Sequence, residues 1–382
     1  MKRICIVAAK RTPQGRFLGS LAKLSALDLA IAAGKANLAT IAPDQIDQVI
    51  LGNILAAGQG MNLARQAGVH LNIPLDRPAY TVNMMCASGM QAILLAAQTI
   101  QSGQANAVLC GGSESMSNAP YLLDRARKGY KFGDGVLIDT ILRDGLVDSF
   151  DNEHMGLTAE RIAEKYSISR DQQDQFSADS QQKYGRAHQQ GKFDDELAAL
   201  DELDRDEHAR PETTAEKLST LAPAFKTEGT VTAGNASGIN DGSAVCVVCD
   251  EATAQNNGWQ PLATLTDFTA VGCDPKVMGL GPVYATRKLC KKLSCQIDDF
   301  DTVEINEAFA AQTLGCVKEL NIDPKRLNPE GGAIALGHPI GASGARLIVH
   351  LAHRIARNES QKCLATLCVG GGMGVAAILE TY

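Results

Sequence analysis

The chain has 382 residues, more than the roughly 250–300 at which one hydrophobic core stops growing, so its length indicates two or three domains. A net charge of −7 excludes a general nucleic-acid-binding or membrane-surface role, because phosphate binding requires a basic face. Hydrophobic residues make up 45% of the chain and charged residues 21%, which is the balance of a soluble globular protein.

The N-terminal segment "MKRICIVAAKRTPQG" has no long apolar region, and no segment reaches about 18 unbroken apolar residues. We therefore predict neither a secretory signal nor a membrane helix. The eleven cysteines are scattered without the spacing of a disulfide framework, which favours reduced thiols and a cytoplasmic location. Cys246 and Cys249 form a lone CxxC pair in a β-branched run. Their spacing points them to opposite faces of a strand, so we predict core packing rather than a metal site.

The first 118 residues alternate strands with helices, a pattern typical of a mostly parallel sheet covered on both faces. A helix capped by Ser25 and a helix that opens near Cys86 are the clearest signals. In chain order the predicted elements are a buried strand that ends in a turn at 3–13, helix 25–39, strand 46–55, helix 61–72, helix 83–100 and strand 105–112.

The composition changes after residue 118. Residues 119–227 are polar and rich in helix signals, with a solvated helix predicted at 169–193 and an acidic connector at 201–214. The strand–helix pattern resumes near residue 231 and continues to the end. We therefore interpret 119–227 as an inserted domain.

An internal repeat joins residues 86–112 to residues 341–371. Each copy has Ala-Ser-Gly, an apolar helix, a polar turn, and a strand that ends at cysteine and glycine. Two similar halves are expected to stack these helices face to face. The loops after their strands would then converge on one site.

Reactive side chains are set among small residues in four segments: Cys86, the pair Asn306 and Glu307, His338, and Cys368. Each has an ordinary structural alternative, since free cysteines are usually core, Asn and Glu cap helices, and a histidine between Gly and Pro is often a turn residue. A cysteine at a helix N-terminus has a second reading, because unpaired N–H groups stabilise a thiolate there. Together the four segments supply two thiols, an imidazole and an amide, which suit acyl transfer.

Long motifs then identify a family. "VNMMCASGMQA", "GGSESMSNAP", "HMGLTAERIA", "NEAFAAQ", "GGAIALGHPIGASGAR" and "LCVGGGMG" occur in order along essentially the whole chain. The sequence resembles the thiolases, and within them the acetyl-CoA acetyltransferase type. The resemblance implies an α/β thiolase fold, five-layered αβαβα from two similar halves. It implies an N-terminal half at 1–118 completed by about 228–257, a loop domain at 119–227 that covers the coenzyme A site, and a C-terminal half at 258–382.

The resemblance also implies roles for individual residues. Cys86 matches the nucleophile that carries the acyl group, and His338 matches the residue that deprotonates it and helps hold a thioester oxygen. Cys368 matches the acid/base at the substrate α-carbon. Asn306 matches a residue that orients a water in the oxyanion site with His338, and the backbone N–H groups of Cys86 and Gly370 match a second oxyanion site.

Further positions match the family's binding pocket. The loop domain would support the coenzyme A nucleotide through Arg210, and Ser237 would hydrogen-bond the pantetheine. The remaining matches are Phe225 and Ala233, which would contact the pantetheine, and His154, Met155, Met278, Ala308 and Phe309, which would line the pocket. A basic cluster at 125–134 is a further candidate for the phosphates, or a solvated loop. Ala222 stands where the family often has a basic residue, and "DNEHMG" replaces a more aromatic stretch, which leaves the coenzyme A contacts and pocket shape open.

The predicted activity is the Claisen condensation of two acetyl-CoA to acetoacetyl-CoA and CoA, and the reverse thiolysis, by a ping-pong route through S-acetyl-Cys86. Met155 would crowd a long acyl tail. The alternative is a degradative 3-ketoacyl-CoA thiolase of broader chain length, and a remote one is a non-catalytic acyl-binding protein. A ketoacyl-carrier-protein synthase usually has a single cysteine, so Cys368 speaks against it. No metal, no cofactor, no nucleic acid and no membrane is expected as partner, and the resemblance makes a homo-oligomer, a dimer or tetramer, the expected assembly.

Overall fold

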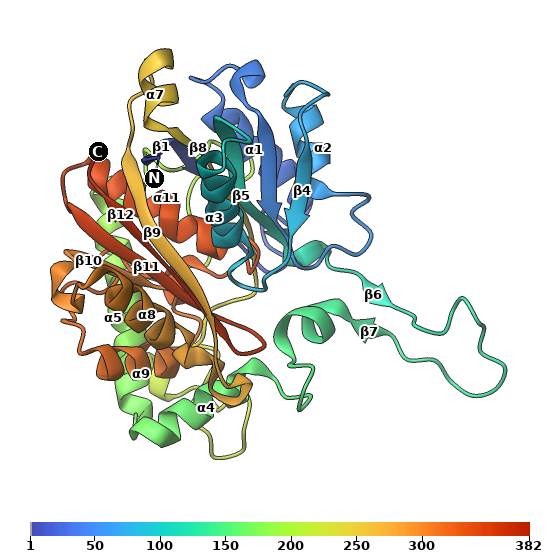
Figure 1. Cartoon of the computed structure of the whole chain (residues 1–382). Helices are drawn as coiled ribbons and strands as arrows, with labels where there is room; N and C mark the ends of the chain where they lie inside the picture. Colours follow the sequence, from blue (N-terminus) through green and yellow to red (C-terminus); the bar gives the residue numbers. More distant parts are fainter. Residues whose placement is uncertain (1) are drawn as a thin grey trace.

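The computed structural model describes residues 2–382 and consists of layered helices and strands around one large sheet (Figure 1). Four predicted elements are confirmed with shorter bounds: strand β1 (Ile4–Arg11), helix α1 (Ala26–Asn37), strand β3 (Gln48–Gly52) and helix α2 (Leu63–His70). Ser25 caps α1 as predicted, because its side chain accepts a hydrogen bond from the backbone N–H of Asp28. No helix among residues 2–382 is long and apolar enough to span a membrane.

Ten strands form one hydrogen-bonded array in the order β10-β11-β12-β9-β1-β8-β5-β3-β4, with β2 paired to β8. The remaining strands are β2 (Gly15–Arg16), β4 (Ala79–Val82), β5 (Ala107–Ser115), β8 (Asn240–Asp250), β9 (Ala263–Gly272), β10 (Thr302–Ile305), β11 (Lys362–Val369) and β12 (Met373–Glu380). The prediction of a mostly parallel sheet is wrong: only β3–β4, β3–β5 and β10–β11 are parallel pairs. The other pairs are antiparallel: β11 and β12 form a hairpin, β12 also pairs with β9, β1 pairs with β8 and β9, and β8 also pairs with β2 and β5.

The strand array contains two copies of one arrangement. In the first, β3 lies parallel to β5, which pairs antiparallel with β8, and β8 pairs antiparallel with β1. In the second, β10, β11, β12 and β9 repeat that pattern. The copies join where Ile4–Ile6 of β1 pair with Ala263–Leu265 of β9. Two similar halves are therefore present, joined edge to edge.

Helices α3 (Ser88–Gln101) and α11 (Ser343–Ala356) lie together between the two half-sheets (Figure 1). Their close approach depends on glycine, because a Cβ added at Gly344 would lie 2.8 Å from the Cβ of Met90. The outer faces are covered by α1 and α2 on one side, and by α8 (Gly281–Leu293) and α9 (Ala310–Leu320) on the other. This gives five layers, as expected, and confirms that the repeat helices stack.

Cys246 and Cys249 are fully buried in β8 and belong to different core clusters on its two faces, as the spacing predicted. The other helices are α4 (Met155–Tyr166), α5 (Arg170–Gln189), α6 (Ala215–Ser219), α7 (Glu251–Asn257) and α10 (Ala333–Leu336). A short hairpin, β6 (Tyr121–Leu122) and β7 (Ile138–Asp139), bounds an arm that projects from the body (Figure 1).

The solvated helix predicted at 169–193 is wrong in one respect. Helix α5 buries one face, although that face is polar. Ser180 donates to Glu307, and the side-chain amide of Gln181 donates to the carbonyl of Ile334. The acidic connector is also partly internal, since buried Asp206 pairs with buried Arg11 at 2.7 Å. The polar pattern predicted a surface helix, but Ser180, Gln181 and Asp206 are buried and each has a partner.

Candidate active site

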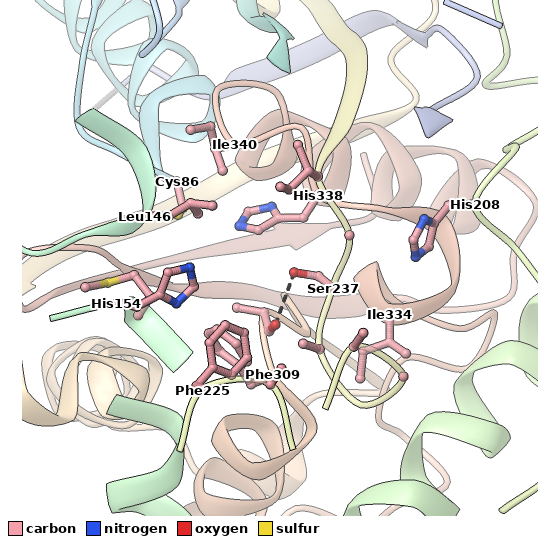
Figure 2. Close-up of a pocket in the computed structure, with 18 of the residues that line it drawn as sticks. Cys86, Leu146, His154, His208, Phe225, Ser237, Phe309, Ile334, His338 and Ile340 are labelled. Carbon is pink, nitrogen blue, oxygen red and sulfur yellow. Dashed lines mark hydrogen bonds between the residues drawn. The ribbon is translucent and has the colours of Figure 1, made fainter. Parts of the chain in front are cut away.

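A cavity of about 510 Å³ lies where the two halves meet. Cys86, from the turn before α3, and Cys368, from the end of β11, both line it, as do His338 and Gly370 (Figure 2). The two sulfurs therefore share one cleft. Met116, directly after β5, lines the same cavity, so the loops after the paired repeat strands converge as predicted.

Cys86 lies on a strained turn between β4 and α3. Met85, the residue before it, has φ of +46°, a left-handed conformation that is uncommon for a non-glycine residue. The turn uses the first N–H groups of the helix for itself, since Ala87 donates to the Met84 carbonyl and Ser88 to the Met85 carbonyl. Cys86 is partly exposed to the cavity but surrounded by protein. Burial raises the pKa of the Cys86 thiol to about 11, although the backbone N–H groups of Gly370 and Cys86 act to lower it.

The sequence suggested that the helix N-terminus could stabilise a Cys86 thiolate, but in the unliganded structure burial of the sulfur acts against that form. The helix's leading N–H groups are already bonded within the turn, and desolvation of the sulfur outweighs what remains. The resting group is a neutral thiol. The N–H groups of Cys86 and Gly370 nevertheless both face this sulfur, which is the pair that the resemblance assigns to an oxyanion site.

His338 lies on the loop between α10 and α11, and both of its ring nitrogens have neighbours. Nδ1 lies 2.5 Å from the hydroxyl oxygen of Ser343, and Nε2 lies 3.5 Å from the side-chain nitrogen of Asn306. Its backbone N–H donates to Asn240 at 2.9 Å, and Gly337 before it has φ of +112°. Burial, and then the charge of Arg346, lower the pKa of His338 to about 3, so the imidazole is neutral at rest.

A buried carboxylate holds this loop against the N-terminal half. Glu114, at the end of β5, accepts hydrogen bonds from the backbone N–H groups of Ile54, Leu55 and Gly341 and from the side chain of Asn53. All four partners are donors, which favours the ionised carboxylate, but burial raises the pKa of Glu114 to about 7. Glu114 thus ties a loop of the N-terminal half to the loop that carries His338.

Cys368 is fully enclosed at the end of β11. Burial, and then the neighbouring thiols of Cys86 and Cys316, raise its pKa well above the usual value. Asn306 follows β10 and lies behind His338 rather than on the cavity wall. Its side-chain oxygen is buried and has no hydrogen-bond partner among residues 2–382.

The outer part of the cavity is apolar with a few polar groups. The rings of His154 and Phe225 stack with centroids 4.6 Å apart, and Phe225 meets Phe309 edge-on at 6.1 Å. The hydroxyl of Ser237 donates to the Ala308 carbonyl at 3.1 Å (Figure 2). This lining suits a long flexible substrate with an apolar arm.

Thirteen of the fourteen predicted site residues line the cavity, and the fourteenth, Asn306, touches His338. They are Cys86, His338, Cys368, Gly370, Arg210, Ser237, Ala233, Phe225, His154, Met155, Met278, Ala308 and Phe309. Glu307, in contrast, points away and accepts from Ser180, Asn328 and the Ile334 N–H. The basic cluster at 125–134 lies on the projecting arm and does not line this chain's cavity.

The sequence reasoning missed His208, which lines the end of the cavity away from Cys86 (Figure 2). Its ring lies against Gly238, since a Cβ at that glycine would be 2.4 Å from the histidine Cε1. Burial, and then the charge of Arg210, lower the pKa of His208 to about 4. The only sequence signal was its place two residues before Arg210. Leu146, Gln181 and Ile340 were also missed.

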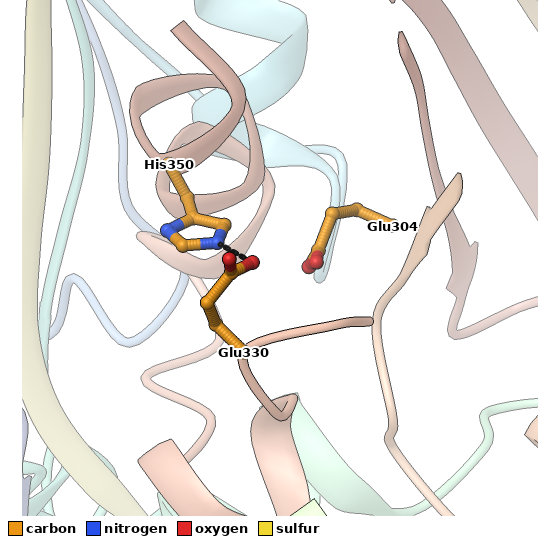
Figure 3. Close-up of side chains that lie close together, drawn as sticks. All are labelled: Glu304, Glu330 and His350. Carbon is orange, nitrogen blue, oxygen red and sulfur yellow. Dashed lines mark hydrogen bonds and ion pairs between the residues drawn. The ribbon is translucent and has the colours of Figure 1, made fainter. Parts of the chain in front are cut away.

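One buried cluster, Glu304, Glu330 and His350, has the residue types of a metal site (Figure 3). Its groups are instead matched to one another. Burial lowers the pKa of His350, but Glu196 and Glu330, bonded to its two ring nitrogens at 2.9 and 3.2 Å, raise it to about 10. Glu304 pairs with Arg346 at 3.2 Å, and Glu330 also pairs with Arg354. A charged imidazole has no lone pair for a metal, so this cluster is an ion-pair network.

Comparisons with known proteins agree with this geometry. The chain matches the family model of the thiolase N-terminal domain over residues 4–252 and that of the thiolase C-terminal domain over residues 259–381. It is 48% identical to an acetyl-CoA acetyltransferase of Chromobacterium violaceum, with 99% of each chain covered, and 46% identical to one of Cupriavidus necator, with 100% of each covered. Among solved structures, a Bacillus anthracis acetyl-CoA acetyltransferase superposes with a TM-score of 0.97 at 41% identity, covering 100% of this chain and 99% of that one. Human mitochondrial 3-ketoacyl-CoA thiolase, in complex with CoA, gives the same TM-score and identity, with 100% of this chain and 98% of that one covered.

Proposed function

Because the chain belongs to the thiolase family, we propose that it is an acetyl-CoA C-acetyltransferase, which condenses two acetyl-CoA to acetoacetyl-CoA and CoA and catalyses the reverse thiolysis. The observation that carries this proposal is the presence of two thiols and a neutral imidazole in one cavity. One thiol can hold an acyl group while the other exchanges a proton with carbon.

The first half-reaction starts from neutral groups. Nε2 of His338 takes the proton from Cys86 as its sulfur attacks the acetyl-CoA carbonyl, and the tetrahedral oxyanion is held by the N–H groups of Cys86 and Gly370. The C–S bond to CoA then breaks, and the departing CoA sulfur takes the proton of Cys368. This leaves S-acetyl-Cys86, a Cys368 thiolate and a protonated His338.

In the second half-reaction the Cys368 thiolate takes a proton from the α-carbon of a second acetyl-CoA. The enolate oxygen that forms is stabilised by protonated His338 together with a water that the side chain of Asn306 orients. The new carbanion attacks the acetyl carbonyl, the bond to the Cys86 sulfur breaks, and that sulfur recovers its proton from His338. All three groups return to their neutral resting forms, which suits their shifted pKa values.

Two variants test these roles. Cys86→Ala should abolish covalent labelling by radioactive acetyl-CoA. Cys368→Ser should still become labelled on Cys86 but lose condensation, because serine is a poor base at the α-carbon. Normal condensation by Cys368→Ser would contradict the proposal, as would labelling of the protein that persists in Cys86→Ala.

A second candidate, a 3-ketoacyl-CoA thiolase of broader chain length, has its own support. A neighbouring cavity of about 480 Å³ adjoins the first at Gly145, Met155 and Gly370, and its lining includes Ile54 and Phe150. An acyl tail that passed Met155 would enter it. Thiolysis rates for ketoacyl-CoAs of four to about twelve carbons decide between the two, and clear turnover of eight or more carbons would favour the broader enzyme.

We also propose that the protein is a homo-oligomer. The arm between β6 and β7 projects from the body (Figure 1), and several of its apolar side chains are exposed. They include Tyr121, Leu123, Phe132, Val136 and Leu137, with Phe132 fully exposed. A second copy of the chain would bury them. Light scattering should give a dimer or tetramer, and a variant with residues 123–136 replaced by a short Gly–Ser linker should form a smaller assembly.

The proposed chemistry needs no metal and no prosthetic group, since thiols, imidazole and N–H groups supply each step. Activity should therefore survive prolonged dialysis against a chelator. The eleven free cysteines suit a reducing compartment, and we propose a cytoplasmic location, which cell fractionation tests.

A further inference from the structure

The Ala-Ser-Gly motif of each repeat places a serine under the loop that carries a reactive side chain. In the first repeat, the Ser88 hydroxyl donates to the Met85 carbonyl at 2.6 Å and accepts from the Met84 N–H at 2.8 Å. In the second, the Ser343 hydroxyl donates to the Pro339 carbonyl at 2.9 Å and lies 2.5 Å from Nδ1 of His338. Both serines close the turn that precedes their helix, but only Ser343 contacts the reactive side chain itself.

The partners of Ser343 determine where the proton of the imidazole lies. A serine hydroxyl has one hydrogen, and the Pro339 carbonyl, which also accepts from the backbone N–H groups of Ala342 and Ser343, can accept it at 2.9 Å. With that hydrogen directed to Pro339, the Ser343 oxygen accepts from Nδ1–H of His338 at 2.5 Å. The contact at the other ring nitrogen is compatible with this form, because the Asn306 side-chain nitrogen lies 3.5 Å from Nε2 and fits a bare nitrogen there.

Because the His338 ring is neutral, the position of its single proton decides which ring nitrogen can act as a base. Burial lowers the pKa of His338 to about 3, so the imidazole carries one proton at physiological pH, and that proton is on either Nδ1 or Nε2. Only the form with the proton on Nδ1 leaves Nε2, the nitrogen that faces Asn306, free to accept a proton from Cys86.

We propose that Ser343 is a positioning residue that locks His338 in the Nδ1–H tautomer, so that the bare Nε2 is always ready to act as the base for Cys86. This inference rests on the proposed function, in which His338 deprotonates Cys86. The tautomer assignment itself rests on the contacts of His338 with Ser343 and Asn306 and on the contact of Ser343 with Pro339. Ser343 need not touch the substrate to act in this way, because it acts through His338.

Ser177 provides a matched control. It is also buried in a helix, and its hydroxyl donates to the carbonyl four residues earlier, that of Gln173, at 2.8 Å, as Ser343 does to Pro339. Ser177→Ala therefore removes the same kind of hydroxyl and the same backbone hydrogen bond, without any contact to an imidazole. The difference between Ser343→Ala and Ser177→Ala isolates the effect on His338.

Two measurements test the proposal. Nitrogen NMR of the histidine rings, with His338 identified by the signals lost in His338→Gln, should show the proton on Nδ1 in the native protein and in Ser177→Ala. Ser343→Ala should show a shift toward Nε2–H. In rapid-mixing experiments the rate of acetyl transfer to Cys86 should fall about 10- to 100-fold in Ser343→Ala, within the range of general-base catalysis, while KM for acetyl-CoA changes less than about threefold.

Native His338 with its proton on Nε2 would overturn the proposal, and this result does not require any variant to fold. The proposal would also fail if Ser343→Ala kept the Nδ1–H form and its rate of acetyl transfer to Cys86 lay within about twofold of the rate of Ser177→Ala. If the native protein showed the Nδ1–H form but turned over no acetyl-CoA or acetoacetyl-CoA, the proposed function would fail while the assigned tautomer stood.

Discussion

The protonation state of Cys86 makes a direct prediction about its reactivity. Only a thiolate reacts with iodoacetamide at a useful rate, so the alkylation rate of a neutral thiol follows the small thiolate fraction. Burial raises the pKa of Cys86 to about 11. The fraction of thiolate should therefore increase about tenfold for each pH unit below that value.

The size of the effect follows from the shift. At pH 7 a thiol of pKa about 11 has roughly one hundredth of the thiolate that the same thiol would have at its usual pKa of 9.0. Between about pH 7 and about pH 9 the alkylation rate of Cys86 should increase about 100-fold. A thiolate stabilised by the helix N-terminus, which the sequence suggested, would instead react at a constant rate over this range.

Mass spectrometry of the Cys86 peptide after timed alkylation gives the rate at each pH for this cysteine alone. The unliganded protein is required, because bound substrate covers the sulfur. A plot of log rate against pH with a slope near one would support a neutral resting thiol. A plateau beginning below about pH 8 would refute the reasoning, since it would show that the N–H groups of Gly370 and Cys86 outweigh desolvation.

Three further predictions concern other parts of the molecule. His208→Phe should raise KM for acetoacetyl-CoA about five- to tenfold with kcat unchanged, because it removes a hydrogen-bonding group from the cavity. The control is His70→Gln, at an exposed histidine. An equal rise in KM for a truncated thioester would contradict the reasoning. Gly344→Ala should lower the free energy of unfolding by about 1–3 kcal/mol in urea titrations, because the new Cβ would lie 2.8 Å from the Cβ of Met90. The control is Gly272→Ala, whose Cβ would have a single neighbouring atom at 4.0 Å, and it should leave the free energy of unfolding almost unchanged. Because the pKa of His350 is raised to about 10, its protonated imidazole should stabilise the fold fully below pH 6.5, and this contribution should be lost as pH rises toward about 10. His350→Gln should therefore flatten the dependence of the unfolding free energy on pH. An unchanged slope would contradict a charged imidazole.

The sequence located the cavity well because its lining residues lie in long motifs rich in small residues. Thirteen of the fourteen predicted residues lie around one cavity, although their chemical roles are still predictions. His208 was missed because it lies in a polar connector with no periodic pattern. Its position against Gly238 depends on a contact between segments 30 residues apart, which spacing alone does not encode.

Buried charge was the feature that sequence patterns handled least well. Arg11 stands in a segment predicted as strand and turn, yet it is fully buried and pairs with Glu196 at 2.6 Å and with Asp206 at 2.7 Å. Those partners come from the inserted segment, far away in the chain. A charged residue is normally assigned to the surface, and only the fold reveals that a buried arginine has been brought together with two buried carboxylates.

The protonation state of Cys86 could not be inferred from the sequence for a related reason. A cysteine before a helix suggests free N–H groups, but the tight turn at Met85 uses the N–H groups of Ala87 and Ser88 for its own hydrogen bonds. Motif position indicates which group is reactive. Its pKa depends on which donors remain unpaired and on how much solvent is excluded, and both are properties of the folded chain.

The duplicated Ala-Ser-Gly motif explains how two halves can hold one site together. Each serine fixes its own loop, and each glycine admits the opposite half: a Cβ at Gly89 would lie 2.8 Å from the Gly341 carbonyl, and one at Gly344 would lie 2.8 Å from the Met90 Cβ. The two helix starts therefore brace each other, so the positions of Cys86 and His338 are coupled through backbone contacts rather than through either side chain. Different reactive groups can then occupy the two loops without loss of the scaffold. This is why the repeats preserve serine and glycine while one loop presents a thiol and the other an imidazole.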